Sequence, residues 1–497
     1  MKNKRWLWLA GVGLLLIAAF CLLLLLPRRG AAPGPSAALT AAAEGLDETS
    51  LHAVLSAEGD TLNVRQTFRL QNRDGVAHGD VLLRLFAAAF ASEDTSPVAT
   101  AEMAAACYPG GFSAGGATVS SVTANGAKAA YFSQDGDDTC LSVTLPTAWL
   151  PDEALTLEME YTLLLPQSAG RFGWNSGILA LGNAFAQPAV WEDGAWRADP
   201  YDPVGDPFYT RCMNYDVTLV VPAGTVVAAS AVSDAAQTDN GETTLHYSAL
   251  AVRAFGLSLS RQYQLRQKVQ DGVMISAYAR SADAAAELLR YAAQALRCYS
   301  DEFGAYAYPT YTAAEVDFPF GGMEYPGYCM IAAVLLDLGG QQLEWTVAHE
   351  TAHQWWYAVV GSDPVNQAWQ DEGLSEYSVL LYAGRTYGDE AREELARVRL
   401  QTAMRVSTPG AVTPGSPVSY FDTLTDYAIV VYRRGAALFD ALHTADAEGL
   451  RAFLRTYYQR YAFSIASRAD FEALLRQQTG ADYGPLLTDY LDTILNN

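Results

Sequence analysis

The chain has 497 residues, of which half are hydrophobic and 18% are charged. This composition excludes an intrinsically disordered chain, and the length is sufficient for two or three domains with cores of their own. The formal net charge of −23 argues against nucleic acid as a partner, because an acidic surface repels phosphate groups.

The first predicted element is a membrane anchor. Residues 6–26 form an apolar run of 21 residues with basic residues on both sides, and about 20 residues cross the core of a bilayer. We therefore expect a single-pass anchor over residues 1–30, with the body of the protein outside the cytoplasm at the cell membrane. A cleaved signal peptide, which would release the body as a secreted protein, is the alternative.

The next segment is predicted to be a β-rich domain that follows a stalk. Residues 31–48 are rich in Ala, Gly and Pro, which is typical of a flexible stalk. From residue 49 to 265 apolar residues recur with a period of two, most regularly from Leu155 to Leu165. Half-buried antiparallel strands have this pattern, so we expect a β-sandwich-like domain.

From about residue 266 to 497 the pattern changes to that of a mixed α and β domain that ends in helices. The predicted elements are a helix over 282–303 stopped by Gly304, a strand over 311–316, helices around 343–360 and 370–382, and further helices after a Pro/Gly-rich loop at 408–417. The whole chain is thus predicted to be a multidomain α+β protein.

Five cysteines lie outside the apolar run: Cys107, Cys140, Cys212, Cys298 and Cys329. An exported chain can oxidise its cysteines, and a pair of Cys107 with Cys140 is one prediction. Buried free thiols are the equally favoured alternative. The spacing of the cysteines does not indicate a metal site.

A short His-Glu motif carries the chemistry of the sequence. His349 and His353 stand four residues apart in a predicted helix, so both can bind one ion from the same helix face. Glu350 lies at the edge of that face and can reach a water beside the ion. Glu372, in the first turn of the next predicted helix, is available as a third ligand. A catalytic zinc site needs three protein ligands and an open position, so we predict one Zn²⁺ per chain.

The alternative interpretation of this motif is two solvated histidines on a surface helix. It is disfavoured because the flanking residues make the helix apolar on nearly all sides: Trp345, Val347, Trp355, Trp356, Val359 and Val360. Buried histidines beside a buried carboxylate need partners.

Three motifs resemble those of the aminopeptidase N and leukotriene-hydrolase family of zinc peptidases, the gluzincins, and they follow one another along the chain as in that family. They are His349-Glu350-Thr351-Ala352-His353 with Trp369-Gln370-Asp371-Glu372-Gly373, the upstream Phe320-Gly321-Gly322-Met323-Glu324-Tyr325, and the downstream Tyr432-Arg433-Arg434-Gly435-Ala436. The resemblance is firm over residues 310–440. In the β-rich part, the segment 205–209 resembles bacterial members. The family implies a thermolysin-like catalytic domain over residues 266–497.

The resemblance also implies a role for each matching residue. His349, His353 and Glu372 would bind zinc, and Glu350 would be the general base. Tyr432 would donate a hydrogen bond to the carbonyl oxygen as negative charge develops on it.

The remaining implied roles concern the substrate and the surroundings of the metal. Glu324 would pair with the free α-ammonium of a peptide, and the backbone of Gly321, Gly322 and Met323 would hold the peptide extended. Glu376 and Arg434 are candidates for residues that support the metal ligands; an ordinary acid on a helix face is the alternative for Glu376.

The sequence departs from the family pattern at several points. Tyr325 stands where the family has Asn, which would reshape the first subsite, and Arg434 stands where it has Lys. Because 65 residues follow Tyr432, we expect no large C-terminal helical-repeat domain. A second contact to the α-amine is expected from the β-rich domain, with Gln187 as the candidate.

The predicted function is that of a zinc-dependent aminopeptidase acting on peptides with a free N-terminus. Two alternatives remain open: an endopeptidase or other zinc hydrolase on the same scaffold, and a non-catalytic binding or scaffold protein that keeps the site as a relic.

Overall fold

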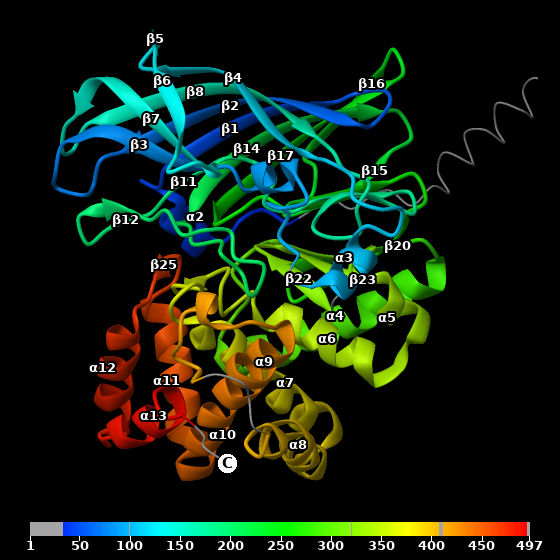
Figure 1. The fold of residues 1–497 in the computed structure, drawn as a ribbon. Coiled ribbons are helices and arrows are strands. Elements are labelled where there is room, and N and C mark those ends of the chain that lie inside the picture. Colours follow the sequence, from blue (N-terminus) through cyan, green and yellow to red (C-terminus); the bar gives the residue numbers. More distant parts are fainter. Residues whose placement is uncertain (1–32, 99, 320, 407–410, 495–497) are drawn as a thin grey trace, which may run out of the picture.

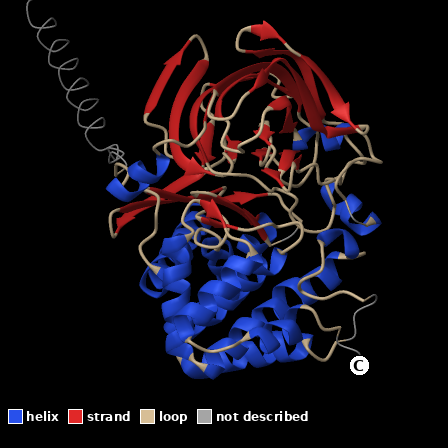
Figure 2. Cartoon of the chain, turned by 90° about the vertical axis from the view of Figure 1, so that its left-hand side faces the viewer, coloured by secondary structure: helices blue, strands red, loops and turns tan. Residues whose placement is uncertain are grey.

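A β-rich half and a helical half are stacked on each other in this protein (Figure 1), and Figure 2 distinguishes their strands and helices by colour. The computed structural model describes residues 33–98, 100–319, 321–406 and 411–494. The predicted membrane anchor lies outside these ranges. Within them, no helix combines the length and apolar character that crossing a membrane requires.

The β-rich half is built from one large sheet and two smaller ones. The large sheet contains, in spatial order, β16 (Ala235–Asp239), β17 (Glu242–Val252), β14 (Met213–Pro222), β1 (Glu48–Leu55), β2 (Thr61–Gln71), β8 (Ala154–Leu164), β4 (Gly116–Ala124) and β5 (Ala127–Lys128). Burial along β8 alternates without a break, which confirms the period-two prediction for this segment.

The smaller sheets and short helices complete this half. One sheet runs β15 (Val226–Ala229), β18 (Leu257–Ser260), β10 (Ile178–Leu181) and β9 (Phe172–Asn175); the other runs β11 (Gln187–Pro188), β3 (His78–Arg84), β7 (Asp137–Trp149) and β6 (Ala130–Gln134). The remaining elements are α2 (Ala37–Ala43), η1 (Phe86–Ala91), α3 (Ala101–Cys107) and the hairpin of β12 (Trp191–Glu192) with β13 (Ala195–Trp196).

Two predictions for this half are corrected. The large sheet is not purely antiparallel, because β1 pairs with β14 in parallel; the long connection between them makes this possible, since parallel neighbours cannot be joined by a tight turn. The segment 37–48 is not a flexible stalk. Ser36 caps α2 by accepting from the amide of Leu39, and Leu39 and Ala43 are buried, because an Ala-rich segment with a capping serine forms a stable helix once its apolar side chains are covered.

The five cysteines outside the apolar run are all free thiols, so the predicted pair of Cys107 with Cys140 is wrong. Cys140 is buried on β7, where its thiol donates to Asp137 Oδ2 at 3.5 Å. Cys107 ends α3 and faces the main cavity instead.

The second half begins with a five-stranded sheet, close to the predicted boundary at residue 265. Its order is β19 (Gln264–Gln270), β20 (Val273–Ala279), β21 (Thr310–Val316), β23 (Tyr328–Ala332) and β22 (Gly322–Tyr325). Strands β20, β21 and β23 are parallel, whereas β22 is antiparallel to β23 and forms the edge. Residues of this edge strand line the main cavity of the molecule.

Helices make up the rest of this half. They are α4 (Ala282–Phe303), α5 (Ala333–Leu338), α6 (Gly340–Ala352), η2 (Ala368–Gln370), α7 (Glu372–Tyr387), α8 (Asp389–Ala396), η3 (Arg397–Gln401), η4 (Val418–Tyr420), α9 (Leu424–Tyr427), η5 (Ala428–Arg434), α10 (Gly435–Ala445), α11 (Ala447–Arg460), α12 (Arg468–Thr479) and α13 (Gly484–Leu491), with a short pair of strands, β24 (Val360–Gly361) and β25 (Ser464–Ile465). The helix predicted over 282–303 is confirmed, with Gly304 at its C-cap.

The helix predicted around residues 343–360 is shorter than expected. Helix α6 ends at Ala352, and the chain then turns through Tyr357, which has a φ of 131°. The apolar run that continues to Val360 belongs to this turn and to β24, because a segment buried on all sides has the same composition whether or not it is helical. The turn allows α7 to fold back against α6.

Candidate metal centre

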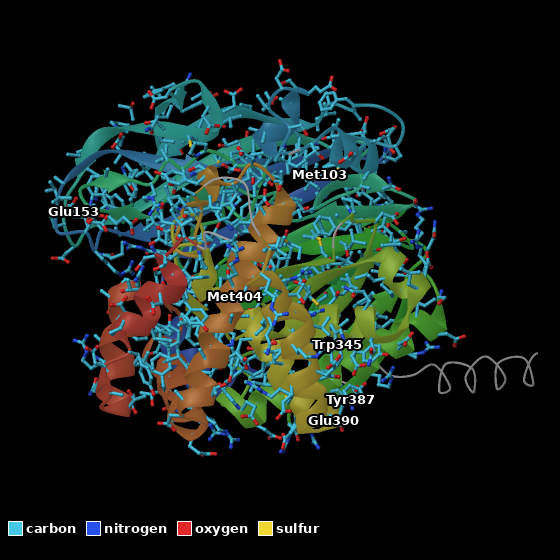
Figure 3. All side chains as sticks on the ribbon, turned by 60° about the horizontal axis from the view of Figure 1, so that its bottom comes forward. Met103, Glu153, Trp345, Tyr387, Glu390 and Met404 are labelled. Atoms are coloured by element: carbon cyan, nitrogen blue, oxygen red, sulfur yellow. The ribbon has the colours of Figure 1, made fainter. Side chains whose placement is uncertain are left out.

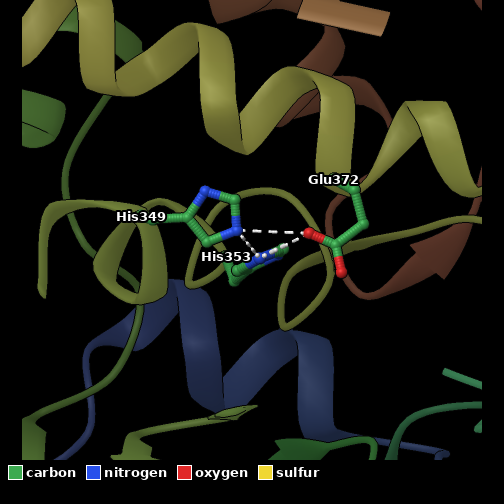
Figure 4. A group of neighbouring side chains, drawn as sticks. All are labelled: His349, His353 and Glu372. Atoms are coloured by element: carbon green, nitrogen blue, oxygen red, sulfur yellow. Dashed lines mark hydrogen bonds and ion pairs between the residues drawn. The ribbon is translucent and has the colours of Figure 1, made fainter. Parts of the chain in front are cut away.

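Three predicted ligands converge at the end of α6 and the start of α7 (Figure 4). The Nε2 atoms of His349 and His353 are 3.0 Å apart. Glu372 Oε2 lies 3.2 Å from His349 Nε2 and 3.4 Å from His353 Nε2. Residues four apart on a helix share a face, and the first residue of the following helix closes the triangle.

The dimensions of this triangle fit a zinc ion. Zinc bonds of about 2.0–2.2 Å in a tetrahedron separate neighbouring ligand atoms by roughly 3.3 Å, which is close to all three observed distances. The surrounding charge also favours a cation. Burial lowers the pKa of His353, but Glu324 and Asp371 outweigh it and hold that pKa well above its usual value. Burial raises the pKa of Glu372, but the two imidazoles outweigh it and lower the pKa below its usual range.

His353 is oriented by a carboxylate that the sequence analysis did not assign. Its Nδ1 lies 2.6 Å from Asp371 Oδ1, 3.0 Å from Ser375 Oγ and 3.1 Å from the carbonyl oxygen of Trp356. A proton on Nδ1 shared with Asp371 leaves the Nε2 lone pair for a cation. Asp371 stands directly before Glu372, and this adjacency was the signal available in the sequence.

The two residues predicted to support the ligands have different positions. Glu376 Oε2 lies 3.5 Å from His349 Nδ1, and Arg399 donates to Glu376 Oε1 at 2.7 Å. Arg434 contacts none of the three ligands: its guanidinium donates to the carbonyl oxygens of Ala403 and Val406. The prediction for Arg434 is therefore corrected, because its guanidinium supports the backbone at Ala403 and Val406 instead.

Glu350 is buried with one oxygen that lacks a hydrogen-bond partner among the described residues, Oε2. Burial raises the pKa of Glu350 to about 7, although the charges of His349 and His353 lower it. Its carboxylate lies against the backbone of Gly322, where a Cβ atom would come within 2.6 Å of it. Glycine at this position is thus required for space, and the carboxylate can exchange a proton near neutral pH.

Tyr432 reaches the metal ligands from η5. Its hydroxyl donates to Glu372 Oε1 at 2.6 Å, and its ring is stacked on that of His349 with centroids 5.5 Å apart. Burial and the charge of Glu372 raise its pKa well above the usual value, so the phenol remains a donor. Close packing of Gly373 on Gly435 permits this approach, since a Cβ on Gly373 would lie 3.0 Å from the Gly435 backbone.

Two acids from different halves of the molecule lie side by side near the triangle. Glu324, on the edge strand β22, is buried, and burial raises its pKa well above the usual value. Carboxylate oxygens of Glu324, Glu372 and Asp206 lie within 4.8 Å of one another. Asp206, in a loop of the β-rich half, also accepts from Arg171 Nη1 at 2.7 Å.

Gln187 does not take part in this site. Its amide nitrogen donates to the carbonyl oxygen of Arg253 at 3.1 Å, and it lines a separate small cavity in the β-rich half. The prediction of Gln187 as a substrate contact is therefore wrong. Asp206 is the acid that the β-rich half contributes here, within the segment 205–209 that resembles bacterial family members.

One cavity of about 440 Å³ lies between the two halves. The three candidate ligands line it together with Glu350, Tyr432, Glu324 and Asp206. Met103 on α3 and Trp345 on α6, both labelled in Figure 3, are among its walls. Gly321, Gly322 and Met323 line it beside Glu324. Six acidic residues reach the cavity: Asp202, Asp206, Glu324, Glu350, Glu372 and Glu376. These acids outnumber the three arginines of the lining, Arg171, Arg399 and Arg433. A cavity with an excess of acidic groups attracts cationic groups.

Residues 288–490 match the Peptidase family M1 domain. Aminopeptidase M1-B of Oryza sativa subsp. japonica is 27% identical over 219 positions, and the alignment covers 41% of this chain and 25% of that protein. Aminopeptidase N of Lactobacillus delbrueckii subsp. lactis is 27% identical over 278 positions, with 51% of this chain and 33% of that protein covered. The chain thus spans a quarter to a third of the length of these curated relatives. Over the matched segment, the resemblance to aminopeptidase N-type enzymes is confirmed.

Solved structures share the fold. The crystal structure of the M1 zinc metallopeptidase from Deinococcus radiodurans has a TM-score of 0.65 and 19% identity, and the superposition covers 91% of this chain and 96% of that one. A mutant of the same enzyme bound to the substrate Tyr-Ser-Ala has a TM-score of 0.64 at 19% identity, covering 91% of this chain and 95% of that one. This likeness confirms the predicted multidomain α+β architecture with a β-rich first half and a helical end.

Proposed function

We propose, from the premise that residues 288–490 form a Peptidase family M1 domain, that the protein is a zinc-dependent aminopeptidase. The observation that carries the proposal is a shared cavity. The triangle of His349, His353 and Glu372 opens into the same space as the adjacent acids Glu324 and Asp206. A peptide that places its α-ammonium between these acids brings its first peptide bond next to the triangle.

The chain supplies the groups for hydrolysis of that bond. A bound zinc ion supplies Lewis-acid polarisation of a carbonyl group and of water. Glu350 takes the proton of the attacking water and passes it to the leaving amine. Tyr432 donates its hydroxyl hydrogen to the carbonyl oxygen while negative charge develops there; one such donor contributes about 3–4 kcal/mol to the transition state. The hydroxyl of Tyr432 turns from Glu372 to the substrate for this purpose.

The two acids at the end of the cavity make the enzyme an exopeptidase in this proposal. Glu324 and Asp206 each accept a hydrogen bond from the α-ammonium, and charge-assisted hydrogen bonds of this kind are about twice as strong as neutral ones. Arg171 donates to Asp206 Oδ1 and fixes the position of that carboxylate in the cavity wall. A peptide with a blocked N-terminus leaves the buried Glu324 without a cation, which costs binding energy.

We also propose that residues 6–26 anchor the enzyme in the cell membrane as a single pass, with the catalytic body outside the cytoplasm. The proposal rests on the apolar run and its basic flanks. Fractionation of cells that express the full chain tests it. Recovery of the protein in the membrane fraction, accessible to protease from outside, is expected, whereas a shortened soluble form would indicate cleavage and secretion.

The function is tested by product analysis on short peptides. We expect mass spectrometry to detect stepwise loss of single N-terminal residues, abolished by chelation and restored by Zn²⁺. N-acetylated forms of the same peptides should be resistant. Internal cleavage with equal rates on acetylated and free peptides would instead identify an endopeptidase. A purified protein that binds no zinc would contradict both interpretations.

A further inference from the structure

Tyr325 crosses the boundary between the two halves of the molecule at the end of strand β22. The side chain is fully buried and lies against two glycines of the β-rich half. A Cβ atom on Gly256 would lie 2.5 Å from Cγ of Tyr325, and a Cβ on Gly182 would lie 1.9 Å from its hydroxyl oxygen. The base of the ring therefore rests on Gly256 and its tip on Gly182.

These two glycines are adjacent in space, and their lack of side chains leaves room for the ring of Tyr325. Gly182 directly follows β10 and Gly256 directly precedes β18, and the last and first residues of these strands, Leu181 and Leu257, are paired. Neither glycine has a φ in the left-handed region, so alanine would be acceptable to the backbone. The absence of side chains at Gly182 and Gly256 leaves a slot, and the phenol ring of Tyr325 fills it.

The slot is coupled to both acids that face the α-ammonium. On one side, Tyr325 follows Glu324 directly in β22, and Gln354 donates to the carbonyl oxygen of Tyr325 at 2.9 Å. On the other side, the amide of Gly182 donates to the carbonyl oxygen of Arg171 at 2.7 Å. The guanidinium of Arg171 in turn donates to Asp206 Oδ1, also at 2.7 Å.

We infer that Tyr325 is a positioning residue that sets the spacing of Glu324 and Asp206 and thereby the selectivity for a free N-terminus. The inference rests on the proposed function. Its hydroxyl oxygen has no hydrogen-bond partner among the described residues, so the ring acts through its shape. Packed interiors transmit displacements because they contain little free space. A ring that leaves the slot moves β22 and Glu324 relative to Arg171 and Asp206.

The test compares three variants for hydrolysis of aminoacyl p-nitroanilides and of their N-acetylated forms. Gly182→Ala places a methyl group where the phenol tip lies, and Tyr325→Leu shortens the side chain and empties the tip of the slot. For each single variant we expect KM for the free substrate to rise about tenfold, the scale of a lost hydrogen bond to a charged group. The preference for free over acetylated substrate should fall in parallel, with kcat and zinc content nearly unchanged.

The double variant provides the decisive readout, because the methyl group of Gly182→Ala occupies the space that Tyr325→Leu vacates. We expect the double variant to recover most of the wild-type preference. Gly79→Ala is the matched control: Gly79 lies on β3 with no atom within 4 Å of an added Cβ, and its replacement should leave the preference intact.

Two results would overturn the inference. One is a Gly182→Ala protein that keeps the wild-type KM and preference. The other is a set of single variants that lose zinc and activity on both substrates together, without recovery in the double variant, since that would be general disruption of the fold. Failure of the wild-type protein to hydrolyse any free aminoacyl anilide would refute the proposed function instead, before the variants are compared.

Discussion

The candidate metal centre and the pair of acids Glu324 and Asp206 face one cavity but are assembled in different ways. The ligands His349, His353 and Glu372 all come from two consecutive helices of the second half. The acids Glu324 and Asp206 come from an edge strand of the second half and a loop of the first. Helix geometry pairs His349 with His353, and the packing of α7 on α6 within the second half adds Glu372. The second set depends on how the two halves pack.

Because of this difference, a substitution can impair substrate selectivity without impairing metal binding. A change at the boundary between the halves can alter the spacing of Glu324 and Asp206, which lie on opposite sides of it, while the three candidate ligands all lie on one side. Substrate selectivity is therefore expected to be more sensitive to the packing of the two halves than metal binding is. Variants at each part of the site test this separation.

Glu350→Gln tests the metal-centre side of the comparison. We expect kcat to fall by about 10³-fold, because the amide cannot accept the proton of the attacking water. Zinc content, measured by atomic absorption on the purified protein, should stay at one per chain, since Glu350 is not one of the three ligands. A variant that loses zinc along with activity would show that Glu350 contributes to metal binding.

Tyr432→Phe removes the hydroxyl group that donates a hydrogen bond to Glu372. We expect a fall in kcat of about 10²-fold with little change in KM, because the hydrogen bond is formed mainly in the transition state. Tyr420→Phe, at a phenol that is 65% exposed, is the control and should retain full activity. Equal losses of kcat and of substrate affinity would argue that Tyr432 binds the ground state instead.

Asp206→Asn tests the pocket that spans the two halves. KM for peptides with a free N-terminus should rise about tenfold, while zinc content and the slow reaction of acetylated peptides stay the same. Asp202→Asn is the matched control, because Asp202 lines the same cavity but accepts from the amide of Val204 at 2.9 Å. Similar effects of both variants would indicate general attraction by negative charge.

The smallest expected effect concerns the large sheet of the β-rich half, away from the cavity walls. Asp234 and Asp216 raise the pKa of His246 on β17. Because the folded-state pKa is raised, this contribution to stability is complete below pH 6.5 and is lost as the pH rises through the raised value. Since the ring is 35% exposed, the contribution is at most ~0.5 kcal/mol.

Asp234→Asn should therefore lower the melting temperature slightly at pH 6 and hardly at pH 8, without any change in peptidase kinetics. Thermal unfolding at the two pH values measures this difference. A larger loss at pH 8 than at pH 6 would contradict the sign of the effect.

The convergence of the candidate metal ligands, and the place of Glu350 beside them, were predictable because their arrangement is local. His349, Glu350 and His353 follow from the helical repeat, and Glu372 from the helix that comes next in the chain. Period-two burial in β8 and the end of α4 at Gly304 follow from equally local rules. Each of these features depends on residues near one another in the sequence.

The features that were missed depend on contacts between distant segments. Asp206 rather than Gln187 faces Glu324, Arg434 turns away from the metal ligands, and β1 pairs in parallel with β14. The packing of Tyr325 against two glycines of the β-rich half likewise depends on contacts between distant segments. By itself the sequence determined the ion-binding motif and the elements that carry it, because backbone periodicity places those side chains. Only the tertiary structure decided that Asp206 lies beside Glu324, because packing of one half on the other has no signature in any single segment.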